Sequence, residues 1–330
     1  MPFMAFTKVL PLFSLRKKPF LVQVHAALVL YLNINFYYGI MIENSELIIN
    51  PDGSIYHLHL LPQDISNNII LVGDQGRVKI VANNFDTIEL EKSNREFFTI
   101  TGTYKGKRFT VISTGIGTDN IDIVINELDA LVNIDFKTRT IKTNKKTLNF
   151  IRIGTSGGLQ HKINAGDFVL STHAVGFDSV LNYYKNVDDV SDNNAVNDFL
   201  NQIDWNNKLP KPYIVKASDK LVKLFSNKEF HFGYTISAPG FYGPQGRILR
   251  LQNFNKNINA QIEKFEYKKN KINNYEMECS AIYGLSALLK HNALTVCVVI
   301  ANRVNKSFIN DYKPIVEKLI VKVLDKLVEL

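Results

Sequence analysis

The sequence predicts a single α/β domain whose central sheet is largely parallel or mixed and is covered by helices on both faces. Short apolar runs typical of strands alternate with amphipathic stretches typical of helices, which is the order found in layered α/β proteins. Several of these runs end in glycine-rich turns, at the edge of the sheet where such folds bind ligands. The 330 residues contain neither an internal repeat nor a Pro- or Ser-rich linker, so we expect one domain.

Six apolar runs are the predicted strands. They are short, rich in Ile, Val and Leu, and bounded by turn-forming residues, as expected of buried strands. They cover Asn68–Val72, Phe109–Thr114, Asn149–Ile153, Asp167–Thr172, Tyr234–Ala238 and Leu294–Ala301.

Three amphipathic stretches are the predicted helices, because their apolar residues recur every three to four positions. Two polar segments, Val187–Asn197 and Lys264–Lys271, are predicted to be a surface insertion and a solvated face or loop. The apolar helix faces are Ile121-Val124-Ile125-Leu128-Leu131, Met277-Ala281-Leu285-Leu288-Leu289 and Ile315-Leu319-Val323-Leu327.

The composition is that of a globular protein from a reducing compartment. Hydrophobic residues make up 45% of the chain and charged residues 21%. The two cysteines, Cys279 and Cys297, lie in apolar segments, which argues against a disulfide framework and a metal cluster. Outside residues 1–40 the lysines are scattered rather than gathered in a basic stripe. We therefore expect a cytoplasmic protein with neither a nucleic-acid nor a membrane partner.

Residues 1–40 do not share the pattern of the rest. They contain no acidic residue, and their four cations supply half of the net charge of +8. Cations precede the apolar run 19–32, as in a signal peptide, but polar residues interrupt the run and no clear cleavage site follows. The alternative is an extension created by a mis-assigned start, with Met41 as the natural first residue. We favour the latter, because a compact fold can begin at Glu43, and we take residues 41–330 as the domain.

Three glycine-rich turns follow predicted strands, at Gly73–Arg77, Gly115–Gly117 and Gly154–Gly158. Glycine permits positive φ angles and close backbone approach, so successive N–H groups can point at one anion. Arg77 closes the first turn, Arg152 lies two residues before the third, and Thr155 adds a hydroxyl. Such donors suit a phosphate. Neither the Walker A spacing nor the full dinucleotide fingerprint is present, so the sequence predicts inorganic phosphate rather than ATP or NAD.

An ordered series of short motifs resembles the nucleoside phosphorylase family, and within it the uridine phosphorylases. The resemblance runs from about Tyr56 to Leu330 and implies that family's fold, a single domain with a mixed, partly barrel-like central sheet flanked by helices. The motifs are Tyr56-His57-Leu58, Gly73-Asp74-Gln75-Gly76-Arg77, Asn94-Arg95-Glu96-Phe97, Gly115-Ile116-Gly117, Arg152-Ile153-Gly154-Thr155-Ser156-Gly157, Phe241-Tyr242-Gly243-Pro244-Gln245-Gly246-Arg247 and Tyr275-Glu276-Met277-Glu278.

The resemblance also implies the site residues, with Arg152, Glu278 and Arg247 as the catalytic ones. Phosphate would be held by Gly73, Arg77, Arg152 and Thr155, and by Arg95 from a neighbouring subunit. The ribose would be held by Met277 and Glu278, with Glu278 on its 2′- and 3′-hydroxyls, and by His57 of the neighbour on its 5′-hydroxyl. The base would meet Phe241 on its face and Gln245 and Arg247 on its polar edge. Shared sites of this kind imply a homo-oligomer built from dimers, commonly a hexamer.

The chemistry of glycosidic cleavage requires these residue types whether or not the resemblance is considered, because the reaction passes through an oxocarbenium-like sugar. A clamped phosphate dianion can stabilise that cation and then attack it, so positioning and electrostatics supply most of the catalysis. The departing base gains negative charge, which an arginine and an amide can meet. We therefore expect no metal and no organic cofactor, with inorganic phosphate as co-substrate.

The predicted reaction is phosphorolysis of a pyrimidine nucleoside, in which uridine and phosphate give uracil and ribose 1-phosphate. Purine-cleaving relatives place an aspartate after the strand Val296–Ile300 to protonate N7, whereas this chain has Asn302. The alternatives are a purine phosphorylase or a nucleosidase on the same fold, and a non-catalytic nucleoside-binding protein. Arg303 contacts the base region or ties down a strand end, and the sequence leaves both open.

Three acids need separate interpretation. Glu276 and Glu278 lie two residues apart, hence on different faces of the predicted helix, so one is expected at the sugar and the other at a helix start or in a surface pair. Asp119 departs from the family pattern, as does Gln75-Gly76, and it would repel a phosphate unless it caps its helix facing away.

Overall fold

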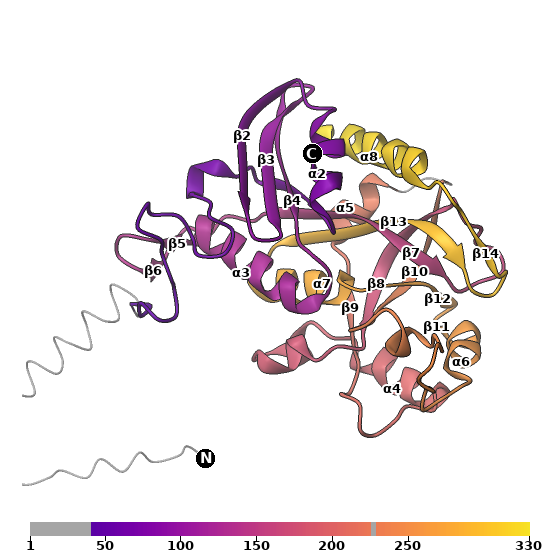
Figure 1. The fold of residues 1–330 in the computed structure, drawn as a ribbon. Coiled ribbons are helices and arrows are strands. Elements are labelled where there is room, and N and C mark those ends of the chain that lie inside the picture. The colour runs from indigo at the N-terminus through magenta and orange to yellow at the C-terminus, as the bar shows by residue number, and fades with distance from the viewer. Residues whose placement is uncertain (1–40, 226–228) are drawn as a thin grey trace, which may run out of the picture.

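The computed structural model describes residues 41–225 and 229–330, so the predictions for residues 1–40 lie outside the described residues. These residues form one α/β domain around a twelve-stranded sheet, shown in Figure 1. Its main path runs β11-β12-β10-β8-β13-β7-β1-β4-β3-β2, with β9 paired to β8 and β14 to β13. The strands are β1 (Asn68–Val72), β2 (Thr87–Asn94), β3 (Phe97–Tyr104), β4 (Lys107–Ser113), β7 (Asn149–Gly158), β8 (Phe168–Gly176), β9 (Tyr213–Lys216), β10 (Phe230–Ser237), β11 (Glu266–Tyr267), β12 (Asn270–Glu276), β13 (Asn292–Asn302) and β14 (Ser307–Phe308).

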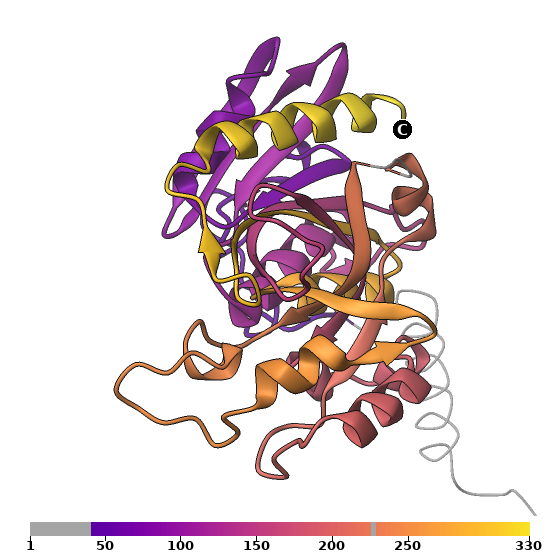
Figure 2. The ribbon, with the colours of Figure 1, turned by 90° about the vertical axis from the view of Figure 1, so that its right-hand side faces the viewer.

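Part of the sheet closes into a barrel. Strands β7, β13, β8, β10 and β12 pair in turn, and β12 pairs back onto β7 through Asn274 opposite Gly158. The ring mixes parallel and antiparallel pairs, since β13 is parallel to β7 but antiparallel to β8, and β12 is parallel to β10 but antiparallel to β7. The ring curves around the centre of the molecule in Figure 2. The predicted mixed, partly barrel-like sheet is therefore confirmed.

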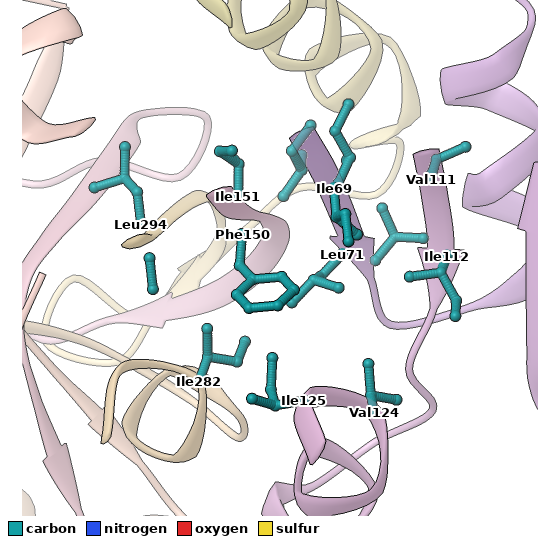
Figure 3. Packing of buried hydrophobic residues seen from close by; sticks show 14 of the residues in the cluster. Ile69, Leu71, Val111, Ile112, Val124, Ile125, Phe150, Ile151, Ile282 and Leu294 are labelled. Carbon is teal, nitrogen blue, oxygen red and sulfur yellow. The ribbon is translucent and has the colours of Figure 1, made fainter. Parts of the chain in front are cut away.

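Helices cover both faces of the sheet. The longest are α3 (Thr118–Asn133), α7 (Cys279–Leu289) and α8 (Lys313–Val328), and the shorter ones are α2 (Gln75–Ala82), α4 (Asn193–Gln202), α5 (Asp219–Leu224) and α6 (Ile258–Lys264). Phe150 of β7 lies between the strands and the pair α3 and α7, whose Ile125 and Ile282 face it in Figure 3. The predicted apolar face of α3 is fully buried, as expected of an amphipathic helix. Among the described residues, no helix is both long and apolar enough to span a bilayer.

Of three predictions about local structure, the first two are wrong. The glycine stretch 154–158 is not a turn, because β7 continues through it alongside the eleven-residue β13. The polar segment Val187–Asn197 contains the start of α4, whose first N–H groups are capped by Asp192. The segment Lys264–Lys271 runs from the end of α6 through the hairpin of β11 and β12, and its exposed lysines agree with the predicted solvated face.

The helix predicted from the apolar residues Met277 to Leu289 begins later than that pattern suggests. Helix α7 starts at Cys279, so Met277 lies in the connection from β12 and not on the helix face. Ala281 and Leu285 are buried as predicted. Strands β2 and β12 were not predicted, because their polar or Asn-rich residues do not form apolar runs. Strand β3 was also missed, although its Phe97, Phe98 and Ile100 are apolar and buried.

Candidate active site

A cavity of about 340 Å³ lies where several strands end, and it contains most of the predicted site. Every predicted site residue except His57 and Arg95 lines it, together with residues that the sequence did not single out. Strands β1, β7, β12 and β13 and the connection after β10 all contribute to its wall. The lining residues from the prediction are Gly73, Arg77, Arg152, Thr155, Phe241, Gln245, Arg247, Met277 and Glu278.

Arg152 is the central cation of this cavity and is almost fully buried. Its guanidinium donates to the carboxylate of Glu278, lies 3.5 Å from Glu276 Oε2, and donates to Cys297 Sγ at 3.5 Å. Its Nε–H has no partner among the described residues. The two carboxylates raise the pKa of Arg152 even though burial opposes them. The thiol of Cys297 stays neutral, since burial raises its pKa to about 12, and it can only accept weakly. Arg152 therefore remains positively charged, and its Nε–H is still available to donate to a ligand.

Gly154 is needed for the position of Arg152. Residues two apart on a strand share a face, and the Arg152 side chain folds back over Gly154. A Cβ at Gly154 would lie 1.9 Å from Arg152 Nη1 and 3.0 Å from Cys297 Sγ. The glycine therefore serves side-chain packing inside a regular strand rather than a turn.

Glu276 and Glu278 lie on either side of the connection into α7, and neither is on a helix. Glu276 accepts the hydroxyl of Ser237 and the N–H groups of Glu278 and Cys279, so it closes the start of α7. Burial raises the pKa of Glu276 to about 7, while Arg152 opposes that rise. The prediction of separate helix faces is wrong because the helix begins only after both residues. One acid does serve the helix start, as expected.

Arg77 lies in the first turn of α2, next to the turn that follows β1. Asp74 caps this helix by accepting the Arg77 N–H at 2.9 Å, and its other oxygen lies 3.0 Å from Arg77 Nη2. Arg77 Nη1 also donates to Ile153 O of β7 at 3.4 Å. Helix α2 and strand β7 thus bring Arg77 and Arg152 to one cavity, as the sequence predicts.

A second polar group contains Gln245, Arg247 and Arg303. Gln245 is buried, and its Oε1 accepts from Arg247 Nη1 at 2.7 Å and from Arg303 Nη2 at 2.7 Å. Guanidinium groups only donate, so the amide oxygen must face them and its NH₂ is left to donate elsewhere. Burial lowers the pKa of both arginines, that of Arg303 to about 10. Of the two interpretations of Arg303, the structure favours contact with the region predicted to bind the base, because Arg303 donates to Gln245.

Aromatic rings surround this polar group. The Arg247 guanidinium lies 3.6 Å from the ring centre of Phe241, and that of Arg303 lies 5.0 Å from the ring centre of Tyr275. Tyr275 and Phe241 both line the cavity, so a flat ligand would meet ring faces near the amide of Gln245.

His57 and Arg95 do not line the cavity but belong to one surface cluster. Asn94 Nδ2 donates to His57 O at 2.8 Å, and the Arg95 guanidinium lies 5.6 Å from the ring centre of Tyr56. The imidazole of His57 contacts Glu127 at 2.7 Å. Gln75 Nε2 donates to Arg95 O at 2.8 Å, which places the tip of the β2–β3 hairpin beside the start of α2.

Asn302 and Asp119, which the sequence singles out, do not line the cavity. Asn302 donates through Nδ2 to Gln160 O and Ile163 O and accepts through Oδ1 from Val304 N and Asn305 N, so its amide is fully used. Asp119 is exposed in the first turn of α3 and does not line the cavity.

The sequence missed Glu276 as a partner of Arg152, and Tyr275, Ile300 and Ala301 as lining residues. Their place at the ends of β12 and β13 is the one signal that could have found them, because ligands collect at strand ends. Within the described part of the chain, no three His, Cys, Asp or Glu side chains gather as a metal site would require.

Residues 68–329 match the Phosphorylase superfamily. The chain belongs to this family. The match covers the strands and helices that build the cavity, and the predicted family, fold and enzyme class, a pentosyltransferase, are confirmed.

Individual relatives agree on the family but differ in substrate. A uridine phosphorylase from Thermococcus kodakarensis is 28% identical over 263 residues, 78% of this chain and 80% of the relative. A DeoD-type purine nucleoside phosphorylase from Alkaliphilus metalliredigens is 28% identical over 246 residues, 74% of this chain and 85% of the relative. A Trypanosoma brucei nucleoside phosphorylase with uridine phosphorylase activity superposes with a TM-score of 0.77 at 29% identity, over 86% of this chain and all of the other.

Proposed function

We propose that this enzyme cleaves uridine by phosphorolysis, giving uracil and ribose 1-phosphate. The observation that carries the proposal is the single cavity in which Arg77 and Arg152, the acid Glu278, and the pair Gln245 and Arg247 all meet. These three groups match the three parts of the reaction, which are an anionic nucleophile, a sugar that becomes cationic, and a leaving base that becomes anionic.

Arg77, Arg152 and Thr155 hold the phosphate dianion. Two guanidinium groups and a hydroxyl supply forked and single donors, and a buried site strengthens each of these interactions. A phosphate oxygen attacks C1′ of the ribose as the bond from C1′ to N1 of the base breaks. The dianion thus stabilises the oxocarbenium-like sugar before it forms a bond with it.

Glu278 accepts hydrogen bonds from the 2′- and 3′-hydroxyls and stabilises the positive sugar electrostatically. Its carboxylate is held by Arg152, so the phosphate subsite and the sugar subsite share one contact. Met277 precedes it in the connection from β12 and lies against the sugar.

Gln245 and Arg247 donate to the carbonyl oxygens of the base as the electron pair of the broken bond moves onto it. The Gln245 amide presents N–H groups, because Arg247 and Arg303 occupy its oxygen. Phe241 packs on the base face. The leaving uracil anion then takes up a proton on N1.

The proposal of a pyrimidine rests on the acids that line the cavity. These are Asp74, which pairs with Arg77, and Glu276 and Glu278, which contact Arg152. None of the three contacts the Gln245 group in the described residues, and the Asn302 amide is fully used elsewhere. A purine leaving group protonated at N7 would need an acid near the base.

We further propose that Arg95 and His57 complete the site of a second subunit, with Arg95 on phosphate and His57 on the ribose 5′-hydroxyl. Their shared surface cluster supports this, because Asn94 at the hairpin tip that carries Arg95 donates to the His57 backbone, so both groups would be delivered together. The assembly would then be a homo-oligomer built from such pairs, with phosphate as co-substrate and with neither a metal nor an organic cofactor.

A substrate panel tests the proposal. Uridine, inosine and adenosine are each incubated with the enzyme and phosphate, and the free base is measured. We expect uracil from uridine at a rate far above that of hypoxanthine or adenine release. Preferred cleavage of inosine would overturn the pyrimidine assignment, and base release in the absence of phosphate would overturn phosphorolysis.

A further inference from the structure

The glycine turn at Gly115–Gly117 is the part of the predicted anion site that the proposed function leaves unused. It follows β4 and leads into α3, and Gly117 is the residue just before the first turn of that helix. Its N–H donates to Glu278 Oε1 at 2.9 Å, and both groups are buried. The Gly117 N–H is therefore already hydrogen-bonded to Glu278, the acid proposed to bind the ribose hydroxyls.

The two oxygens of Glu278 have different partners. Oε2 accepts from Arg152, and Oε1 accepts from Gly117. Arg152 has a second proposed task, which is to bind the phosphate dianion. Gly117 N–H has no such second task, so it keeps Glu278 in place whichever partner Arg152 takes.

Helix α3 adds an electrostatic contribution. The helix has sixteen residues, its first turn has no side-chain cap, and its positive end lies at Gly117. A carboxylate near that end is stabilised by the unpaired N–H groups and the helix dipole.

Only glycine allows this contact. Gly117 has a φ of +100°, a conformation that other residues rarely adopt. A Cβ there would also lie 2.7 Å from Asp119 Oδ1. A larger residue must shift the backbone, and with it the N–H that holds Glu278.

We propose that Gly117 is a positioning residue of the sugar subsite: its backbone N–H orients Glu278 toward the ribose hydroxyls and does not bind the phosphate. This proposal rests on the proposed function, since it takes the ribose role of Glu278 from there. It predicts that disturbing Gly117 impairs use of the nucleoside but not of phosphate.

The first test compares Gly117→Ala with Gly106→Ala. Gly106 also has a positive φ, +76°, but a Cβ there would meet nothing within 4 Å, so this control carries the backbone strain without the contact. We expect the KM for uridine to rise about tenfold or more in Gly117→Ala, which is the size of one lost hydrogen bond to a charged group. The KM for phosphate should stay within about twofold, and Gly106→Ala should match the wild type in both. Equal rises in both KM values, or a larger rise for phosphate, would overturn the proposal.

A second measurement does not depend on whether Gly117→Ala folds. Hydrogen–deuterium exchange of a peptide spanning Gly115–Thr118 is compared in the wild type and in Glu278→Ala. We expect faster exchange in the variant, because the Gly117 N–H loses its acceptor. Unchanged exchange would show that the contact does not protect this amide and would contradict the proposal.

Glu278→Ala also separates the two proposals. If Glu278→Ala leaves uridine turnover unchanged, the ribose role itself fails, and the proposed function with it. If Glu278→Ala abolishes turnover while Gly117→Ala leaves the KM for uridine unchanged, only the role of Gly117 fails.

Discussion

Gly154→Ala tests whether Arg152 binds phosphate without altering any charge or polar group. The new Cβ would lie 1.9 Å from Arg152 Nη1 and 2.8 Å from its Cζ, so the guanidinium must leave its present position. The backbone at Gly154 has no positive φ and pairs regularly with Cys297 of β13, so alanine suits the strand itself. The substitution therefore displaces mainly the Arg152 side chain, with a small shift of Cys297, and leaves the strand pairing intact.

The expected size follows from the hydrogen bonds that Arg152 would lose. A hydrogen bond to a charged group contributes about 1.5–3 kcal/mol. At about 1.4 kcal/mol for each factor of ten, the KM for phosphate should rise roughly 10- to 150-fold. The turnover number should fall as well, because the dianion is then poorly placed to stabilise the sugar cation.

Initial rates against phosphate concentration measure the effect in Gly154→Ala, Arg152→Ala and the double variant. If Gly154→Ala acts by displacing Arg152, it should add little once Arg152 has been removed. An unchanged KM for phosphate in the single variant would refute the reasoning. An equal additional loss in the Arg152→Ala background would refute it too. Thermal melting checks that the variants remain folded.

Three further predictions address the base subsite, the buried acid and the assembly. Arg303→Lys removes the guanidinium that donates to Gln245 Oε1. The KM for uridine in steady-state assays should therefore rise about tenfold, equivalent to about 1.4 kcal/mol, while the KM for phosphate stays constant. Similar rises in both KM values would contradict this role of Arg303. Burial raises the pKa of Glu276 from 4.5 to about 7, so between these pH values the folded protein holds a proton that the unfolded chain releases. The resulting contribution to stability is fully present below the unfolded pKa and is lost as the pH rises through about 7. The melting temperature should fall from pH 6 to pH 8 in the wild type and should fall less in Glu276→Gln. An equal fall in the two proteins would contradict the role of Glu276 protonation. Mixing inactive Arg95→Ala and Arg152→Ala proteins should restore activity if subunits share sites, and no recovery after subunit exchange would contradict the shared site.

The sequence was sufficient for the features that depend on one segment at a time. The apolar run at Asn68–Val72 and the helical pattern from Ile121 to Leu131 appear as β1 and α3, because burial of apolar residues at the right period is a local signal. The resemblance then supplied the site, and the structure brings all of its residues into one cavity except Arg95 and His57.

Features that depend on contacts between two segments distant in the sequence could not be predicted from the pattern of either segment alone. The glycines after Ile153 suggest a turn by themselves, but β13 is available as a long neighbour and extends the strand through them. The polar strand β2 owes its existence to pairing with β3 and not to its own apolar pattern. Met277 and Glu278 look helical by spacing, whereas Glu276 fixes the helix start at Cys279 through its own carboxylate. The orientation of the Gln245 amide likewise follows from Arg303, 58 residues away.

The central claim is that a phosphate held by Arg77 and Arg152 is the nucleophile that releases the base. The most direct measurement follows uracil and ribose 1-phosphate from uridine, with and without phosphate, in the protein that begins at Met41. We expect one ribose 1-phosphate for each uracil, with negligible release of uracil when phosphate is absent. Equal uracil release without phosphate, accompanied by free ribose, would contradict it.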